Sequence, residues 1–186
     1  MLGMCATGFT HEGSAAVKKK LYEILLKYPH VNSGEVKTGS EFNAEMDDIL
    51  AGFEDTSVIH IVFTDKEVVI KVLEEIKAAD LGVSVVLTGV FDETHACCKK
   101  SGITPHTLNQ SVGIMGRTER LPNDQVLGIT TMCGHGLVAA SLVLSLVKKI
   151  RRKKMTLEKA AAELAQPCIC GIFNPKRAEV LLETLI

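Results

Sequence analysis

The chain has 186 residues, of which 46% are hydrophobic and 4% aromatic, and its formal net charge is −1. This hydrophobic content excludes a disordered chain, and the small net charge argues against nucleic acid or acidic lipid as a partner of the whole chain. The longest apolar run, residues 137–147, covers 11 residues and contains two serines, whereas a membrane span needs about 20 residues. We therefore expect a cytoplasmic protein without a membrane partner.

In the first half of the chain, apolar strand patterns alternate with helical patterns. Strands are predicted over residues 1–5, 31–38, 57–64 and 83–90, and helices over 14–28, 42–52, 65–76 and 92–100. Residues 57–64 and 83–90 flank an amphipathic helix, with Thr64 and Glu67 spaced as a capping box, and such a β-α-β unit predicts parallel strands. The expected fold is therefore α/β, with a small, mostly parallel sheet flanked by helices and followed by a helical C-terminal part.

The second half is expected to be mainly helical. A weak strand pattern covers residues 108–115, and helices are predicted over 122–129, 134–153, 156–165 and from 175 onward. Asn174 and Pro175 are the preferred residues for a helix cap and a first helical position. A boundary near residue 103 would give a sheet domain over 1–102 and a mostly helical part over 103–186, or the two would form one continuous domain.

Six cysteines carry the main chemical signal: Cys5, Cys97, Cys98, Cys133, Cys168 and Cys170. In a reducing compartment, clustered thiols indicate metal ligands or reactive groups, and the alternative is that each is a small buried hydrophobic residue. Cys133 lies in the segment Met132-Cys133-Gly134-His135-Gly136. Gly134 and Gly136 would let a ligand approach the backbone, and the expected helix start would favour a bound anion and lower the pKa of the thiol.

Cys168 and Cys170 are one residue apart, between Pro167 and Gly171, so both could ligate one metal or form a strained disulfide. With Cys133 and either Cys97 or Cys98 they supply four thiolates, the number that zinc or an iron–sulfur cluster requires. His135 is an alternate ligand or a proton relay. The favoured function is a metal or iron–sulfur site that serves redox or cofactor chemistry.

Two other functions remain open at this stage. A metal-free thiol enzyme would use Cys133 on a small carboxylate or phosphate, with His135 setting its protonation and Arg117 available to bind an anion. A non-catalytic interaction domain would bury its cysteines and use the basic run over residues 148–154 for a partner. That run has six cations in seven positions, and its expected place at a helix end favours a solvated surface over a nucleic-acid site.

Two short stretches resemble sites of known families. Residues 131–136, TMCGHG, are similar to the catalytic-thiol motif of proline racemases and hydroxyproline epimerases, which implies a thiol that moves an α-proton. Cys5-Ala6-Thr7-Gly8, His11 and Ala15-Ala16 resemble the phosphocysteine loop of fructose-type phosphotransferase-system B domains, which implies a nucleophilic Cys5. Both likenesses are local, and both suggest a thiol beneath backbone amides.

Overall fold

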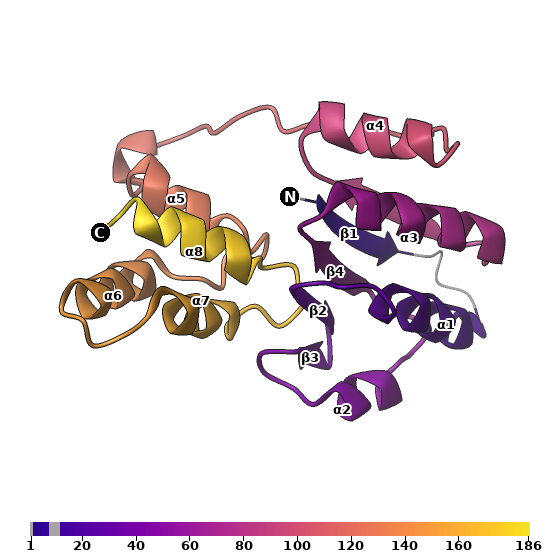
Figure 1. Cartoon of the computed structure of the whole chain (residues 1–186), viewed down its shortest axis with the longest axis horizontal. Coiled ribbons are helices and arrows are strands. Elements are labelled where there is room, and N and C mark those ends of the chain that lie inside the picture. Colours follow the sequence, from indigo (N-terminus) through magenta and orange to yellow (C-terminus); the bar gives the residue numbers. More distant parts are fainter. Residues whose placement is uncertain (1, 8–11) are drawn as a thin grey trace.

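The computed structural model describes residues 2–7 and 12–186 of the chain. Its strands are β1 (Leu2–Thr7), β2 (Asn32–Glu35), β3 (Gly39–Ser40), β4 (Ile59–Phe63) and β5 (Ser84–Thr88). Its helices are α1 (Ser14–Leu26), α2 (Met46–Ala51), α3 (Lys66–Ala79), α4 (Phe91–Lys100), the 3-10 turn η1 (Thr118–Arg120), α5 (Asp124–Thr130), α6 (Ala140–Arg151), α7 (Leu157–Ala165) and α8 (Pro175–Glu183). Figure 1 shows the sheet with α1–α4 on one side and α5–α8 on the other. The α/β class is confirmed.

The strands form one sheet, but the prediction of a mostly parallel sheet is wrong. The strand order is β3-β2-β4-β1-β5, and every neighbouring pair is antiparallel. β4 and β5 do run in the same direction, but β1 lies between them, with Gly3 paired to Val62 on one side and Thr88 on the other. This is a split β-α-β arrangement. The error arose because apolar runs identify strands but do not identify which strand pairs with which.

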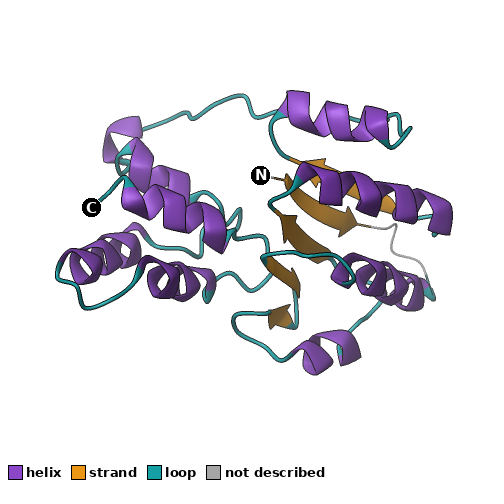
Figure 2. Cartoon of the chain, viewed as in Figure 1, coloured by secondary structure: helices purple, strands orange, loops and turns teal. Residues whose placement is uncertain are grey.

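The two faces of β4 meet different parts of the molecule. Ile59, Ile61 and Phe63 are buried in a core that they share with α1 and α3. Figure 2 shows these helices lying across one face of the sheet. Because successive residues of a strand point to opposite faces, His60 points to the other face, toward the helical part. The sheet therefore separates this apolar layer from the region that holds Cys133, Cys168 and Cys170.

Helices α5–α8 enclose a second hydrophobic core, which includes Cys133, Cys168 and Cys170. The predicted caps of α7 and α8 are present, since the Thr156 hydroxyl accepts from Lys159 N and the Asn174 amide oxygen accepts from Arg177 N. Val36 and Phe42, from the sheet side of residue 103, also pack against this core, so the predicted domain boundary stays a prediction. No helix among the described residues is long and apolar enough to cross a membrane.

Three local predictions are wrong. The helix expected from residue 134 begins only at Ala140, because residues 131–139 form turns that contain the two glycines of MCGHG. Residues 108–115 form no strand and lie exposed in the connection between α4 and η1. The cap of α3 is Asp65, whose carboxylate accepts from Glu67 N, and not Thr64. The errors in α3 and α6 lie at helix starts, where local sequence preferences compete closely, whereas the weak alternation over residues 108–115 has no neighbouring strand among the described residues to pair with.

His30 and Glu41 form a half-buried pair beside β2. His30 Nε2 lies 2.7 Å from Glu41 Oε1, and the Ser33 hydroxyl donates to the same oxygen at 2.8 Å. The hydrogen bond to Glu41 raises the pKa of His30 above its ordinary 6.5, against the opposing effect of burial. Burial raises the pKa of Glu41, but the hydrogen bonds from His30 and Ser33 outweigh it and hold that pKa below 4.5.

We expect this pair to make stability depend on pH. The His30 contribution is complete below its unfolded pKa and is lost as pH rises through the higher folded pKa, whereas the Glu41 contribution is lost as pH falls through its lowered folded pKa. His30→Gln should therefore lower the free energy of unfolding by about 1 kcal/mol at about pH 5.5 and by less at about pH 8.5, as measured by urea unfolding. An equal loss at both pH values would contradict this assignment.

Candidate metal centre

The loop between α7 and α8 is packed against the backbone of β2. Gly171 has a φ of +78°, and a Cβ at this position would lie 2.4 Å from the Ser33 carbonyl carbon and 2.5 Å from Gly34 N. The Asn32 side chain donates to the Phe173 carbonyl at 2.8 Å. Only glycine provides both the left-handed conformation and the close approach. The loop that carries Cys168 and Cys170 is thereby held in a fixed position at the sheet.

Three thiols meet at this loop, and we call Cys133, Cys168 and Cys170 the cysteine cluster. The sulfur atoms of Cys168 and Cys170 are 3.9 Å apart. Cys133, from the turn between α5 and α6, belongs to the same buried core and is near enough to Cys168 for each thiol to influence the pKa of the other. All three residues are at most 2% exposed. Residues 35 positions apart in the sequence are thus brought into one buried sulfur-rich site.

The three thiols differ in their tendency to ionise. The hydrogen bond from Cys168 lowers the pKa of Cys170 in spite of burial, and the same bond, with burial, raises the pKa of Cys168. Burial also raises the pKa of Cys133. The expectation of a helix start that lowers the Cys133 pKa is therefore wrong, because α6 begins seven positions further on, at Ala140. Thiolate character lies with Cys170.

Two imidazoles adjoin the cysteine cluster. His135 is exposed, and its Nδ1 lies 3.5 Å from Cys170 Sγ. His60 comes from β4 and lies near the Cys170 backbone, while its Nδ1 is buried without a hydrogen-bond partner. Burial lowers the pKa of His60 to about 4, and the nearby His135 acts in the same direction. A neutral imidazole with an unpartnered nitrogen therefore stands at the edge of the site.

Two of the separations between these donor atoms are close to the edges of a zinc tetrahedron. With Zn–S near 2.3 Å and Zn–N near 2.05 Å, a tetrahedron has S–S edges of about 3.8 Å and S–N edges of about 3.5 Å. The Cys168–Cys170 and Cys170–His135 separations are 3.9 and 3.5 Å. Within residues 2–7 and 12–186, however, no three His, Cys, Asp or Glu side chains already surround one point as ligands of a metal would.

The other predicted site residues lie elsewhere. Cys97 and Cys98 are buried on α4, where Cys97 Sγ contacts the Lys66 carbonyl at 3.9 Å, and Figure 1 shows α4 well apart from α7 and α8. They do not join the cysteine cluster, because α4 packs on α3 at the sheet side. Arg117 is exposed in the connection before η1. These positions remove Cys97, Cys98 and Arg117 from the site.

The two glycines and the N-terminal loop complete the predicted set. Gly134 and Gly136 are exposed in the turn beside Cys133, and nothing lies within 4 Å of a Cβ built on either. Cys5 lies opposite His60 in the β1–β4 register, while residues 8–11 of the predicted phosphocysteine loop lie outside the described residues. Open space around the two glycines leaves the turn room to adjust around a ligand.

Sequence reasoning missed His60 as part of the site. Its place in the apolar run SVIHIVFT favours a core or face residue, and that reading ignores which segment covers the second face of the sheet. The sequence signal that could have identified His60 is that it is a polar residue within an otherwise apolar strand. No protein-family model matches the chain, and no curated protein or solved structure is significantly similar to it.

Proposed function

We propose that this protein binds one zinc ion through Cys133, Cys168, Cys170 and His135. The observation that carries the proposal is the pair of donor separations, 3.9 Å between two sulfurs and 3.5 Å between sulfur and imidazole nitrogen, which are close to the edges of a zinc tetrahedron. The four donors do not form a closed shell without the metal, so binding would require the exposed turn that carries His135 to move. Cys170, with its lowered pKa, would be the first thiolate to bind.

The donor set favours zinc over an iron–sulfur cluster. Iron–sulfur clusters are usually held by four cysteines, whereas three cysteines and one imidazole form a common zinc site. Among the described side chains, only Cys97 and Cys98 are further thiols, and both belong to the opposite part of the molecule. An iron–sulfur cluster with a redox role is therefore less well supported by these residues than a zinc site.

Bound zinc would join two segments of the helical part, one of which is packed on the sheet. Cys133 and His135 belong to the α5–α6 turn, Cys168 and Cys170 to the α7–α8 loop, and Gly171 packs that loop on β2. Such cross-linking stabilises the folded state, because the unfolded chain lacks the preformed site. When bound, zinc supplies Lewis acidity. His135 is the exposed member of the set, so it is the ligand that a small anionic substrate would replace.

Metal analysis of the purified protein tests the proposal. The wild-type chain should contain about one zinc per molecule after purification without chelators, and cobalt(II) substitution should give thiolate charge-transfer bands. Cys170→Ser should weaken zinc binding by at least about 100-fold, because it removes a ligand and leaves the buried Cys168 without its partner. Cys98→Ser, which also replaces a buried free thiol, should leave binding unchanged.

Two results would overturn the zinc proposal. One is a well-folded wild-type chain that takes up no zinc at micromolar free metal. The other is a Cys170→Ser variant that binds zinc as tightly as Cys98→Ser does. Iron with acid-labile sulfide in protein purified without oxygen would replace zinc by a cluster at the same cysteines.

A metal-free thiol function has one observation in its favour, which is the lowered pKa of Cys170. In that case Cys170, and not the predicted Cys133, would be the attacking thiolate, and the Cys168 thiol would stabilise it by donating a hydrogen bond. Mass spectrometry after brief iodoacetamide treatment of zinc-free protein would identify the thiol that reacts first. First reaction at Cys133 would exclude this assignment.

A further inference from the structure

The connection between α6 and α7 concentrates positive charge, and we call residues 148–159 the basic turn. Its cations are all exposed: Lys148, Lys149, Arg151, Arg152, Lys153, Lys154 and Lys159. In the described part of the chain, only Lys149 has an acidic partner, Glu163 at 3.6 Å, while the Arg151 guanidinium donates to the Leu185 carbonyl. The remaining cations have no ion pair there. A chain of net charge −1 thus carries a strongly positive surface at one end of the helical part.

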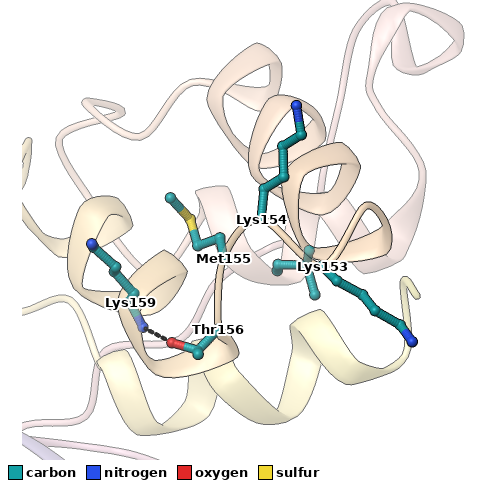
Figure 3. A pocket seen from close by; sticks show the side chains of 6 residues that line it. Lys153, Lys154, Met155, Thr156 and Lys159 are labelled. Carbon is teal, nitrogen blue, oxygen red and sulfur yellow. Dashed lines mark hydrogen bonds between the residues drawn. The ribbon is translucent and has the colours of Figure 1, made fainter.

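The structure shows how the cations of this run are distributed in space, which the sequence did not indicate. Only Lys148, Lys149 and Arg151 lie on α6, while the next three cations follow the end of the helix and Lys159 comes from α7. Together with Ile150, Met155 and Thr156, Lys153, Lys154 and Lys159 line a hollow of about 530 Å³. Figure 3 shows their ammonium groups pointing in different directions around it. The charges therefore cover a broad surface and do not converge on one point.

Lys153 occupies a position that favours glycine. Its φ is +55°, and its N–H donates to the Ile150 carbonyl at 2.7 Å, while Lys154 N donates to the Lys149 carbonyl at 3.0 Å. These bonds close the end of α6 as a Schellman motif, in which glycine is the usual residue. A lysine at this φ is strained relative to glycine, so the protein is less stable with Lys153 than it would be with glycine at this position.

We infer that the basic turn binds the phosphate backbone of a nucleic-acid duplex without reading its sequence. Spread-out lysines match a polyanion that carries one charge per about 1.7 Å of its axis better than a compact ligand with a single phosphate. The turn has no aromatic side chain, so it offers no platform on which unpaired bases could stack. This surface is separate from the cysteine cluster and does not depend on the zinc proposal.

Fluorescence anisotropy with a labelled 20-base-pair duplex tests the inference on the full-length chain. Binding should weaken steeply with salt, and Arg152→Gln/Lys153→Gln/Lys154→Gln should bind at least about tenfold more weakly at low salt with a shallower salt slope. The matched control is Lys99→Gln/Arg117→Gln/Arg120→Gln, which removes the same charge from exposed cations elsewhere and should bind as the wild type does. Equal loss in both triple variants would overturn the inference.

Lys153→Gly separates binding from folding. Because glycine suits the positive φ, this variant should melt at a higher temperature than the wild type and still bind the duplex more weakly, with a salt slope smaller by about one. Unchanged duplex affinity in this variant would count against a contact by Lys153 and the inference with it. Polyglutamate or vesicles of anionic lipid that bind as tightly as the duplex at equal salt would also overturn it.

Discussion

Gly171→Ala should destabilise the protein by about 3 kcal/mol or more and loosen the loop that holds Cys168 and Cys170. The alanine Cβ would lie 2.4 Å from the Ser33 carbonyl carbon, a distance at which backbone must move, and the residue would have to keep a φ of +78°. Because the obstacle is the backbone of β2, no side-chain rotation can relieve it. Urea unfolding measures the loss, and zinc binding should weaken with it because the two cysteines lie in the displaced loop.

Gly134→Ala is the matched control. Gly134 has no positive φ, and nothing lies within 4 Å of the place that an alanine Cβ would take, so we expect a change in unfolding free energy below about 0.5 kcal/mol. Both glycines flank a cysteine of the cluster, so the pair separates steric contact with β2 from proximity to the site. Similar stability of the two alanine variants would show that the α7–α8 loop is not packed on β2 as described.

Zinc should stabilise the wild-type chain strongly. At a free zinc concentration about 1,000 times the dissociation constant, binding adds about 4 kcal/mol, which raises the melting temperature of a chain of this size by about 10 °C. A chelator should reverse the shift. Cys98→Ser should show the same shift as the wild type, while Cys170→Ser should show little or none, as followed by thermal unfolding with and without metal.

The zinc effect should increase with pH. Cys133 and Cys168 have raised pKa values, so the metal-free folded state favours their protonated forms, and that contribution is lost as pH rises above the ordinary thiol value of 9.0. Zinc must displace these protons, so its affinity falls as pH is lowered. We expect a larger melting shift at about pH 8 than at about pH 6. A shift that is independent of pH would indicate that these thiols do not lose protons on binding.

Much of the local structure is evident from the sequence. The apolar runs at residues 57–64 and 83–90 become β4 and β5, and the helix between them becomes α3. Asn174 and Pro175 begin α8 as expected, because a capping amide and a fixed φ act within a few residues of one another. The local pattern of apolar and polar residues was sufficient to predict these helices and strands.

The candidate site was predicted only in part. The sequence indicated Cys133, Cys168, Cys170 and His135, and the structure brings these four together. It leaves Cys97 in the other core and Cys98 beside it on α4, because α4 packs on α3 at the sheet side. His60 joins the site through the face of β4 that the helical part covers.

The sequence by itself determined most of the helices and strands and the caps of α7 and α8, since these depend on neighbouring residues. Only the tertiary structure decided that β1 lies between β4 and β5, that Gly171 packs on β2, and that residues 133 and 168–170 share one site. The physical reason is that strand pairing and loop docking are set by contacts between segments distant in the chain. Their free energies come from burial and hydrogen bonds that no local pattern specifies.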